Sequence, residues 1–447
     1  MTKTLPELLS SDAWLQDVAP ALSADGRALV KETLTQAAAT LGEEESQKFA
    51  KALGALRAPR PEQLAWLRDV DAVQTLPESE KILNLSNILI CHPDTGAPID
   101  WTHSHFPEVT FKRAVFVGKA NFTLATFMGE AYFLEATFTG KVNFLWARFT
   151  AEAQFGGAMF TAEAGFLRAT FTGEAQFLQA TFMSEADFQH AEFLGITIFR
   201  EAHFKQVASF HAARFSKTVS FRGSDWGAVP DFIGTAWKDG VAIADFEQLQ
   251  TQLNKGELDW RNPSTSDPAP ITDRLQALRK MARDADDRPR ELDYFALELQ
   301  ARYQGKGAWA KRFLVNLYGW FSDYGRGVFL PLRGLVELCL LSMLCYWVLA
   351  DGDGSVLSKD RLFAMTYGVL PDVDWSLWDN ALLLSLVNAL PPLGASSWVR
   401  ESSLEALYGS NISDVPGLVH GIAVVEGVIG LILLFLIALG LRNRFRL

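Results

Sequence analysis

The chain has 447 residues, of which 49% are hydrophobic and 21% are charged, and its formal net charge is −11. A chain of this length can form roughly two to four domains, and it is too apolar to be disordered throughout. The negative charge argues against a general nucleic-acid-binding protein, which would carry a basic field. With only three cysteines, no disulfide framework is expected.

The first 90 residues predict a helical N-terminal domain. Apolar residues recur at helical spacing in Leu5–Leu9, Trp14–Val18 and Leu29–Leu41, and Pro59 interrupts the pattern. No catalytic signature stands out there. We expect residues 1–90 to form a helical cap on the segment that follows.

Phenylalanine recurs regularly in the next segment. From Phe106 to Phe221 it returns every five or six residues, and after Phe116 the two steps alternate without exception. Alanine stands two positions before 17 of the 21 phenylalanines that begin with Phe111. Residues two apart point to the same side of an extended strand. A coiled parallel β-solenoid, with phenylalanine and alanine turned inward, satisfies this pattern, whereas a helix or a flat sheet does not.

The dimensions of this coil follow from its period. Four steps give 22 residues per coil and predict about five coils, which at ~4.8 Å per rung make a stack about 25 Å long. Each buried phenylalanine contributes roughly 2–3 kcal/mol. Stacked rings can therefore hold the coil together.

The repeated Ala-x-Phe unit over about residues 104–226 resembles the pentapeptide-repeat family in its Phe-centred variant. The resemblance implies a right-handed quadrilateral β-helix, which we place at residues 91–230. It implies no particular activity, because one fold hosts many functions. Residues 231–315 follow as a loop and an amphipathic helical linker, with two helices in 272–305 that break near Asp286.

The C-terminal part, residues 316–447, predicts a membrane domain. Two apolar segments, at about 328–350 and 416–441, each cover the ~20 residues that a bilayer crossing needs. Basic residues precede the first segment and follow the second, whereas residues 351–415 hold three basic and nine acidic residues. The positive-inside rule then places both termini in the cytoplasm of a multi-pass protein in the cell inner membrane.

A shorter apolar stretch lies between the two spans. Residues 377–390 are too few to cross a bilayer and predict a re-entrant helix. Span, re-entrant helix and span together resemble the pore module of two-transmembrane ion channels. Where a potassium channel would carry a glycine-rich filter, this chain has Pro391, Pro392 and Gly394, so potassium selectivity is not expected.

Ionisable and polar residues in this domain are the candidate site. The pore or gating candidates are Glu426, Asn388, Ser385, Pro391, Pro392 and Gly394. A carboxyl inside a span usually faces water or a partner, so Glu426 either lines a pore or accepts structural hydrogen bonds behind the re-entrant helix. Arg333 and Glu337 lie four residues apart and are expected to pair.

Charged residues also repeat along the solenoid. Two mostly acidic stripes with a 22-residue period are predicted on opposite faces, formed by Glu130, Glu152 and Glu174 and by Lys141, Glu163 and Glu185. One interpretation is DNA mimicry, as in pentapeptide-repeat proteins that protect or inhibit topoisomerases. The other is a solvated face, which the eleven basic and eleven acidic residues of 106–226 favour.

No catalytic chemistry is predicted. The histidines show no metal-ligand spacing, and the chain lacks a phosphate-binding loop, a nucleophile elbow and a dinucleotide fingerprint. We therefore expect neither an enzyme nor a cofactor.

These patterns favour an oligomeric, channel-like integral membrane protein that conducts ions or permeabilises the membrane. Its cytoplasmic solenoid would sense or dock, its partners would be membrane lipid and further copies of itself, and the channel resemblance implies four subunits. No nucleic-acid partner is expected. The alternative is a non-conducting membrane-anchored scaffold whose solenoid binds a cytoplasmic protein partner.

Overall fold

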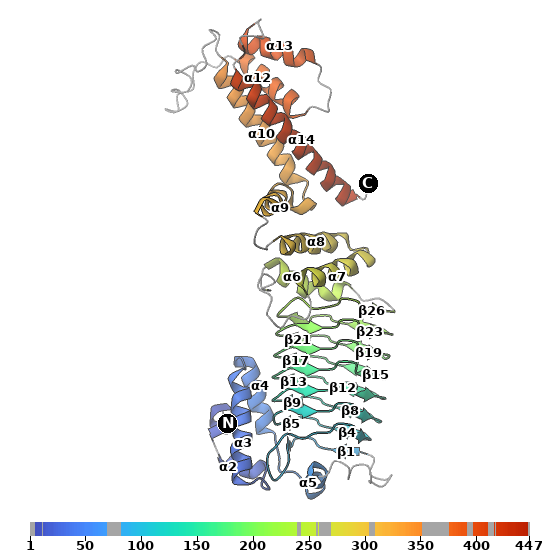
Figure 1. Cartoon of the computed structure of the whole chain (residues 1–447). Coiled ribbons are helices and arrows are strands. Elements are labelled where there is room, and N and C mark those ends of the chain that lie inside the picture. Colours follow the sequence, from blue (N-terminus) through green and yellow to red (C-terminus); the bar gives the residue numbers. More distant parts are fainter. Residues whose placement is uncertain are drawn as a thin grey trace. The chain divides into compact units, whose positions relative to one another are not determined.

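A computed structural model describes residues 5–10, 12–68, 82–238, 243–255, 258, 270–303, 309–350, 375–390, 397–409, 415 and 417–445 (Figure 1). The chain divides into two compact units, Met1–Ala301 and Arg302–Leu447.

The centre of the first unit is the predicted β-solenoid, which is confirmed. Short strands in successive coils pair in parallel and build four sheets, each named here by its order along a coil. Sheet 1 consists of β1 (Ile82–Asn84), β4 (Glu108–Thr110), β8 (Ala131–Tyr132), β12 (Ala153–Gln154), β16 (Ala175–Gln176), β20 (Thr197–Ile198) and β24 (Val219–Ser220). Sheet 2 consists of β2 (Leu89–Ile90), β5 (Val115–Phe116), β9 (Thr137–Phe138), β13 (Met159–Phe160), β17 (Thr181–Phe182), β21 (His203–Phe204) and β25 (Asp225–Trp226).

The other two sheets complete each coil. Sheet 3 consists of β6 (Ala120–Asn121), β10 (Val142–Asn143), β14 (Ala164–Gly165), β18 (Ala186–Asp187) and β22 (Ala208–Ser209). Sheet 4 consists of β3 (His105–Phe106), β7 (Thr126–Phe127), β11 (Arg148–Phe149), β15 (Thr170–Phe171), β19 (Glu192–Phe193), β23 (Arg214–Phe215) and β26 (Ala236–Trp237). The repeat register is 22 residues, as in the pairing of Phe149 with Phe171.

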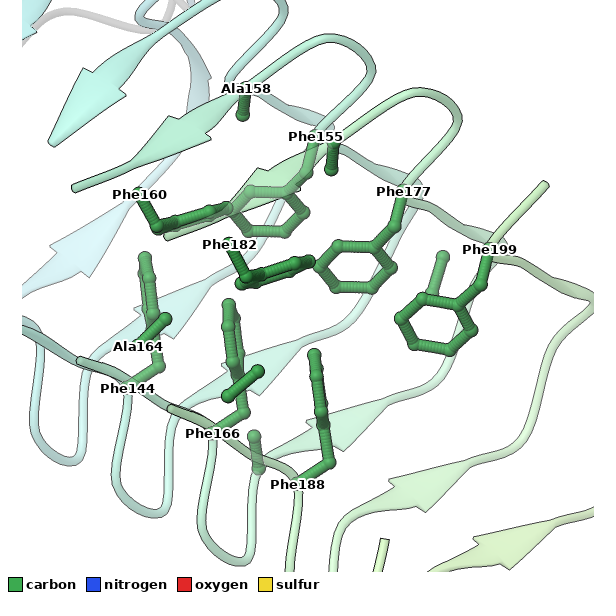
Figure 2. Packing of buried hydrophobic residues seen from close by; sticks show 14 of the residues in the cluster. Phe144, Phe155, Ala158, Phe160, Ala164, Phe166, Phe177, Phe182, Phe188 and Phe199 are labelled. Atoms are coloured by element: carbon green, nitrogen blue, oxygen red, sulfur yellow. The ribbon is translucent and has the colours of Figure 1, made fainter. Parts of the chain in front are cut away.

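Phenylalanine ladders fill the inside of the coil (Figure 2). The rings of Phe144, Phe166 and Phe188 stack with centroids 4.9 and 4.8 Å apart and almost parallel planes. Neighbouring ladders meet edge to face, as where Phe155 lies 5.6 Å from Phe166 at 88°. Both arrangements are favourable for aromatic quadrupoles. The alanines, such as Ala164, are fully buried beside the rings. A small side chain is needed at these positions because a larger one would displace the rings.

The coil is longer than the phenylalanine spacing predicts. Three of the sheets have seven strands, so about seven turns are present and the prediction of five was wrong. The extra rungs carry other apolar residues at the inward position. Trp226 stacks on Phe204 at 4.7 Å and Trp237 stacks on Phe215 at 4.8 Å, while β1 and β2 bury Leu83 and Ile90.

The corners of the coil have a backbone signature that the sequence does not display. Every eleven residues one residue adopts left-handed backbone angles, including Leu124 (φ 59°), Glu135 (φ 54°) and Trp146 (φ 58°). Most of these positions are not glycine, although the conformation is uncommon for other residues. Each such residue turns the chain from one sheet to the next while its side chain points to solvent.

Among the described residues before the coil, the helices are α1 (Leu5–Ser10), α2 (Asp12–Val18), α3 (Ala24–Ala39), α4 (Glu43–Gly54) and α5 (Pro61–Arg68). Apolar residues of α1 to α4 share a cluster with Val115 and Met159, which are outward-facing residues of sheet 2. Only α5, through Leu67, joins the interior core of the coil. The expected cap is therefore α5, and the other four helices cover the side of the solenoid.

Helices also close the C-terminal end of the core. They are η2 (Ile243–Phe246), α6 (Glu247–Lys255), α7 (Ile271–Asp284) and α8 (Arg288–Arg302). Phe246 packs 5.4 Å from Phe221, and Leu275, Leu278 and Tyr294 belong to the same buried core. The segment predicted as an amphipathic linker thus covers the last rung with its apolar stripe.

The second unit is helical. It comprises α9 (Trp309–Ser322), η3 (Asp323–Gly325), α10 (Phe329–Leu349), α12 (Trp375–Ala389), α13 (Ser397–Tyr408) and α14 (Gly417–Phe445). By length and composition α10 and α14 could each cross a bilayer, with mean hydropathies of 1.7 and 2.9 in their most apolar windows. At 15 residues α12 is too short for this.

Candidate functional site

Three of the predicted pore or gating residues, Glu426, Ser385 and Asn388, meet in a buried polar cluster between α10, α12 and α14. Glu426 is 1% exposed although most of its own helix is apolar. The Tyr346 hydroxyl donates to Glu426 Oε2 at 2.6 Å, and the Ser385 hydroxyl lies 2.5 Å from Glu426 Oε1. Helices α10 and α12 therefore each direct a hydroxyl group at one carboxyl group of α14.

A second layer of hydrogen bonds holds these partners in place. Asn388 Nδ2 donates to the Tyr346 hydroxyl at 3.1 Å, and the Ser385 hydroxyl also lies 2.9 Å from the Cys339 carbonyl. Tyr408, the last residue of α13, donates to the Tyr346 carbonyl at 2.9 Å. Since each hydrogen bond joins two helices, the cluster fixes how the helices pack.

Two glycines of α14 allow this approach. A Cβ atom on Gly430 would lie 2.2 Å from the Ala389 carbonyl oxygen, and one on Gly427 would lie 3.3 Å from the Asn388 carbonyl oxygen. Small residues at such contacts let helix backbones come together in lipid. Sequence reasoning missed the roles of Gly427, Gly430 and Tyr346. The available signals were the two glycines three positions apart and a tyrosine hydroxyl in a largely apolar span.

The other predicted membrane residues are separate from this cluster. Pro391, Pro392 and Gly394 lie outside the described residues. Arg333 Nε donates to Glu337 Oε1 at 2.7 Å within α10, one turn apart. Both side chains are exposed, so this pair contributes little to stability in water. The polar side of α12 faces α10 and α14, whereas Leu382, Leu383 and Leu386 are exposed.

The carboxylates of the acidic stripe beside sheet 1 accept hydrogen bonds from neighbouring tyrosine and glutamine side chains. Gln154 Nε2 and Gln176 Nε2 each donate to Glu152 Oε1 at 2.7 Å, and Gln176 also donates to Glu174 at 3.0 Å. The Tyr132 hydroxyl donates to Glu130. Each carboxylate therefore accepts hydrogen bonds from side chains of its own coil, and Glu152 also accepts one from the next coil.

The second stripe, beside sheet 3, carries mixed charge. Lys141 Nζ lies 2.6 Å from Glu163 Oε1, and Glu185 follows one coil later. Burial raises the pKa of nearby Asp187 above its ordinary value. One lysine thus neutralises part of this stripe.

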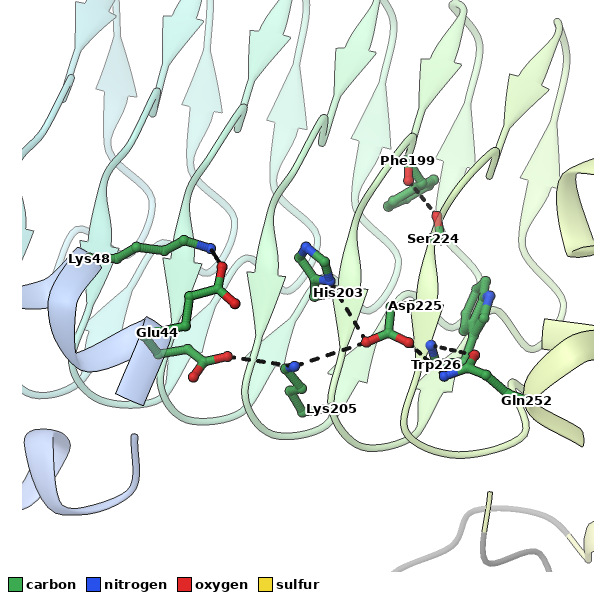
Figure 3. Close-up of polar contacts among 10 residues, drawn as sticks. Glu44, Lys48, Phe199, His203, Lys205, Ser224, Asp225, Trp226 and Gln252 are labelled. Atoms are coloured by element: carbon green, nitrogen blue, oxygen red, sulfur yellow. Dashed lines mark hydrogen bonds and ion pairs between the residues drawn. The ribbon is translucent and has the colours of Figure 1, made fainter. Parts of the chain in front are cut away.

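A polar chain on sheet 2 links the N-terminal helices to the C-terminal cap (Figure 3). Lys205 Nζ lies 3.5 Å from Glu45 Oε1 of α4 and 4.0 Å from Asp225 Oδ2. Gln252 of α6 donates to Asp225 Oδ1 at 2.6 Å. His203 Nδ1 lies 3.8 Å from Asp225 and holds the pKa of that carboxyl below its ordinary value. Four elements are thereby tied along one side of the coil.

The described residues contain no group of three or more His, Cys, Asp or Glu side chains placed to hold a metal ion. Burial raises the pKa of Cys91 to about 12, so its thiol stays protonated near neutral pH. Cys91 packs in the apolar cluster between α1–α4 and sheet 2.

Comparison with known proteins identifies the central segment. Residues 102–145, 124–170 and 155–203 match the family model described as pentapeptide repeats (9 copies). No curated protein and no solved structure matches the chain. The matched residues lie within the four-sheet coil, so residues 102–203 are pentapeptide repeats folded as a β-solenoid.

Proposed function

We propose that the chain is a membrane-anchored interaction scaffold without catalytic activity. In this proposal α10 and α14 cross the cell inner membrane, α12 re-enters it between them, and the cytoplasmic solenoid docks a protein partner. The membrane module positions the solenoid at the bilayer surface and needs no conducting pore to do so.

The observation that carries this proposal is the polar cluster around Glu426. A carboxyl inside a bilayer is expensive unless it has partners or water. Glu426 has partners from α10 and α12 of its own chain, so neither a second copy nor a water-filled path is required to accommodate it. The outward side of α12 presents leucine, which suits lipid.

The helix ends support a topology with both termini on one side. Asn443, near the end of α14, donates to the Gly325 carbonyl at 3.2 Å, just before α10 begins. A Cβ atom on Gly440 would lie 3.3 Å from the Gly327 carbonyl oxygen. The two candidate spans therefore form an antiparallel hairpin, and basic residues such as Arg442 at its open end favour the cytoplasm.

The solenoid offers a docking position at the corner between sheets 3 and 4. Leu124 and Trp146 occupy the left-handed position of this same corner in two successive coils and are 43% and 47% exposed. The Arg168 guanidinium lies 4.7 Å from the centre of the Trp146 ring. A rigid tryptophan beside an arginine is typical of energetic hot spots in protein interfaces.

Site-specific photo-crosslinking in cells tests the scaffold. A photo-reactive residue replacing Leu124 should yield one defined product, and Trp146→Glu should abolish it. The same probe at Glu201, another exposed corner residue, serves as the matched control. Absence of a product at 124 from membrane-inserted protein, or equal products at both positions, would contradict docking at this corner.

A second candidate function is the oligomeric channel. It is favoured by the position of a short α12 between two longer helices, with contacts to both. The purified protein in planar bilayers separates the two candidates. The scaffold predicts no current from folded protein of monomeric mass, whereas a channel predicts tetrameric mass and discrete currents that change in Glu426→Gln.

A further inference from the structure

Helix α9 exposes an apolar side that no described residue of the second unit covers. Phe313, Leu314 and Trp320 are 59%, 63% and 75% exposed. Leu317 lies four positions after Phe313, three after Leu314 and three before Trp320, so the four residues share one side of the helix. Exposed aromatic and aliphatic side chains gathered on one helix side are unusual for a surface in water.

Polar and basic residues flank this apolar side near the start of α9. Lys311 and Arg312 are exposed, as is Asn316 one turn after Arg312. The helix contains no acidic residue. Next to it, Asp323 of η3 lies 2.5 Å from Arg326 and is therefore paired. The local charge around α9 is positive.

A third side fixes α9 at the open end of the α10–α14 hairpin. Ser322 is fully buried and accepts the Gly325 amide hydrogen at 3.3 Å. Phe321 of α9 packs against the buried cluster that contains Leu335 of α10 and Leu433 of α14. Thus α9 is held at the level where α10 begins and α14 ends.

We propose that α9 is an interfacial helix that binds anionic phospholipid, with Phe313, Leu317 and Trp320 in the acyl boundary and Lys311 and Arg312 at the headgroups. This inference rests on the proposed membrane anchoring. Two observations select lipid as the occupant: α9 is followed by the apolar helix α10, whose first residue, Phe329, is also exposed, and the charge complements an anionic surface. Aromatic rings are enriched at this depth of a membrane.

Nitroxide labels on the full chain in nanodiscs of phosphatidylglycerol and phosphatidylcholine test the position of α9. Labels are placed at Phe313→Cys, at Arg312→Cys on the basic side, and at Val424→Cys on the exposed side of α14, in a Cys345→Ser background. Collision with oxygen and with a nickel chelate reports depth. We expect the label at 313 to lie about 5–10 Å below the headgroup level and the label at 312 to lie at the headgroup level, accessible to the nickel chelate.

The reference at 424 separates the two proposals. If the label at 424 is in water, membrane anchoring fails. If it is in lipid but the label at 313 is in water, or is shielded from both reagents, only the interfacial helix is wrong.

The charge is tested by Lys311→Gln/Arg312→Gln with the phosphatidylglycerol retained on the purified protein as readout. Each removed charge should lower the protein's preference for phosphatidylglycerol over phosphatidylcholine about fivefold at low salt. Lys48→Gln/Lys51→Gln, on α4, is the matched control. Unchanged retention in the α9 variant would overturn anionic-lipid binding.

Discussion

Truncating one ring in the middle of a phenylalanine ladder should weaken the whole solenoid. Phe166 is fully buried and stacks between Phe144 and Phe188 at 4.9 and 4.8 Å. It also meets Phe155 and Phe177 edge to face at 5.6 and 5.7 Å. Phe166→Ala removes these four contacts and two further ring contacts, to Phe160 and Phe171 at 6.2 Å, and leaves a cavity with rungs fixed on both sides.

The expected loss follows from these contacts. Truncation of a buried phenylalanine costs about 3–5 kcal/mol, and the cost is higher where neighbours cannot collapse into the cavity. The rungs above and below are held by backbone hydrogen bonds, such as Phe166 N to Asp187 O and Phe144 N to Gly165 O, both 2.6 Å. We therefore expect a loss of about 4 kcal/mol in the free energy of unfolding.

Hydrogen exchange on the full chain measures this loss locally. Because each coil contacts only its neighbours, peptides from about residues 142–189 should exchange first. Their protection should fall roughly 100-fold or more, since every 1.4 kcal/mol is a factor of ten. Leu194→Ala, at an exposed position, is the control and should change stability by only about 0.5 kcal/mol. A loss below about 1 kcal/mol in Phe166→Ala would refute the stacked-core reasoning.

Three further substitutions probe other features. A Cβ atom on Gly173 would lie 2.4 Å from the backbone of the preceding coil, so Gly173→Ala should lower the urea midpoint, while Gly54→Ala, with open space around it, should not. His203 holds the Asp225 pKa low, so this stabilisation is present above the unfolded value of about 3.9 and is lost as pH falls through the folded pKa. Carboxylates titrate in roughly the range from pH 5 to pH 3. Over that range the wild-type protein should therefore lose more stability than Asp225→Asn. Burial raises the pKa of Cys91 to about 12 and so lowers the fraction of reactive thiolate. Alkylation of Cys91 at pH 8 should therefore be at least about 1,000-fold slower than in the unfolded chain.

Each expectation has a contradicting result. An unchanged midpoint in Gly173→Ala would mean that adjacent coils can separate without cost. Parallel pH profiles for wild type and Asp225→Asn would remove the role assigned to that carboxylate. Rapid alkylation of native Cys91 would indicate that the contact between the N-terminal helices and sheet 2 opens readily.

The sequence predicted the solenoid but not its length. The step of five and six residues indicates the coil because every inward position has the same requirement: a large ring beside a small residue. At the ends Leu83, Ile90, Trp226 and Trp237 meet this requirement without phenylalanine, so the period is no longer visible there. The packing of α1–α4 against the outer face of sheet 2 was also not predictable from the sequence. Val115 and Met159 are single apolar residues on an outward face, and only their shared cluster with α1–α4 reveals the contact.

For the candidate site, the sequence identified the residues and the tertiary structure decided their surroundings. Hydropathy alone indicated two apolar helices with a short helix between them, because length and composition set what a helix can span. The same residues left open whether Glu426 faces a pore or a structural partner. Three helices bring Tyr346 and Ser385 to its two oxygens from 80 and 41 positions away. Such contacts depend on how helices rotate and approach, which packing determines and local sequence does not.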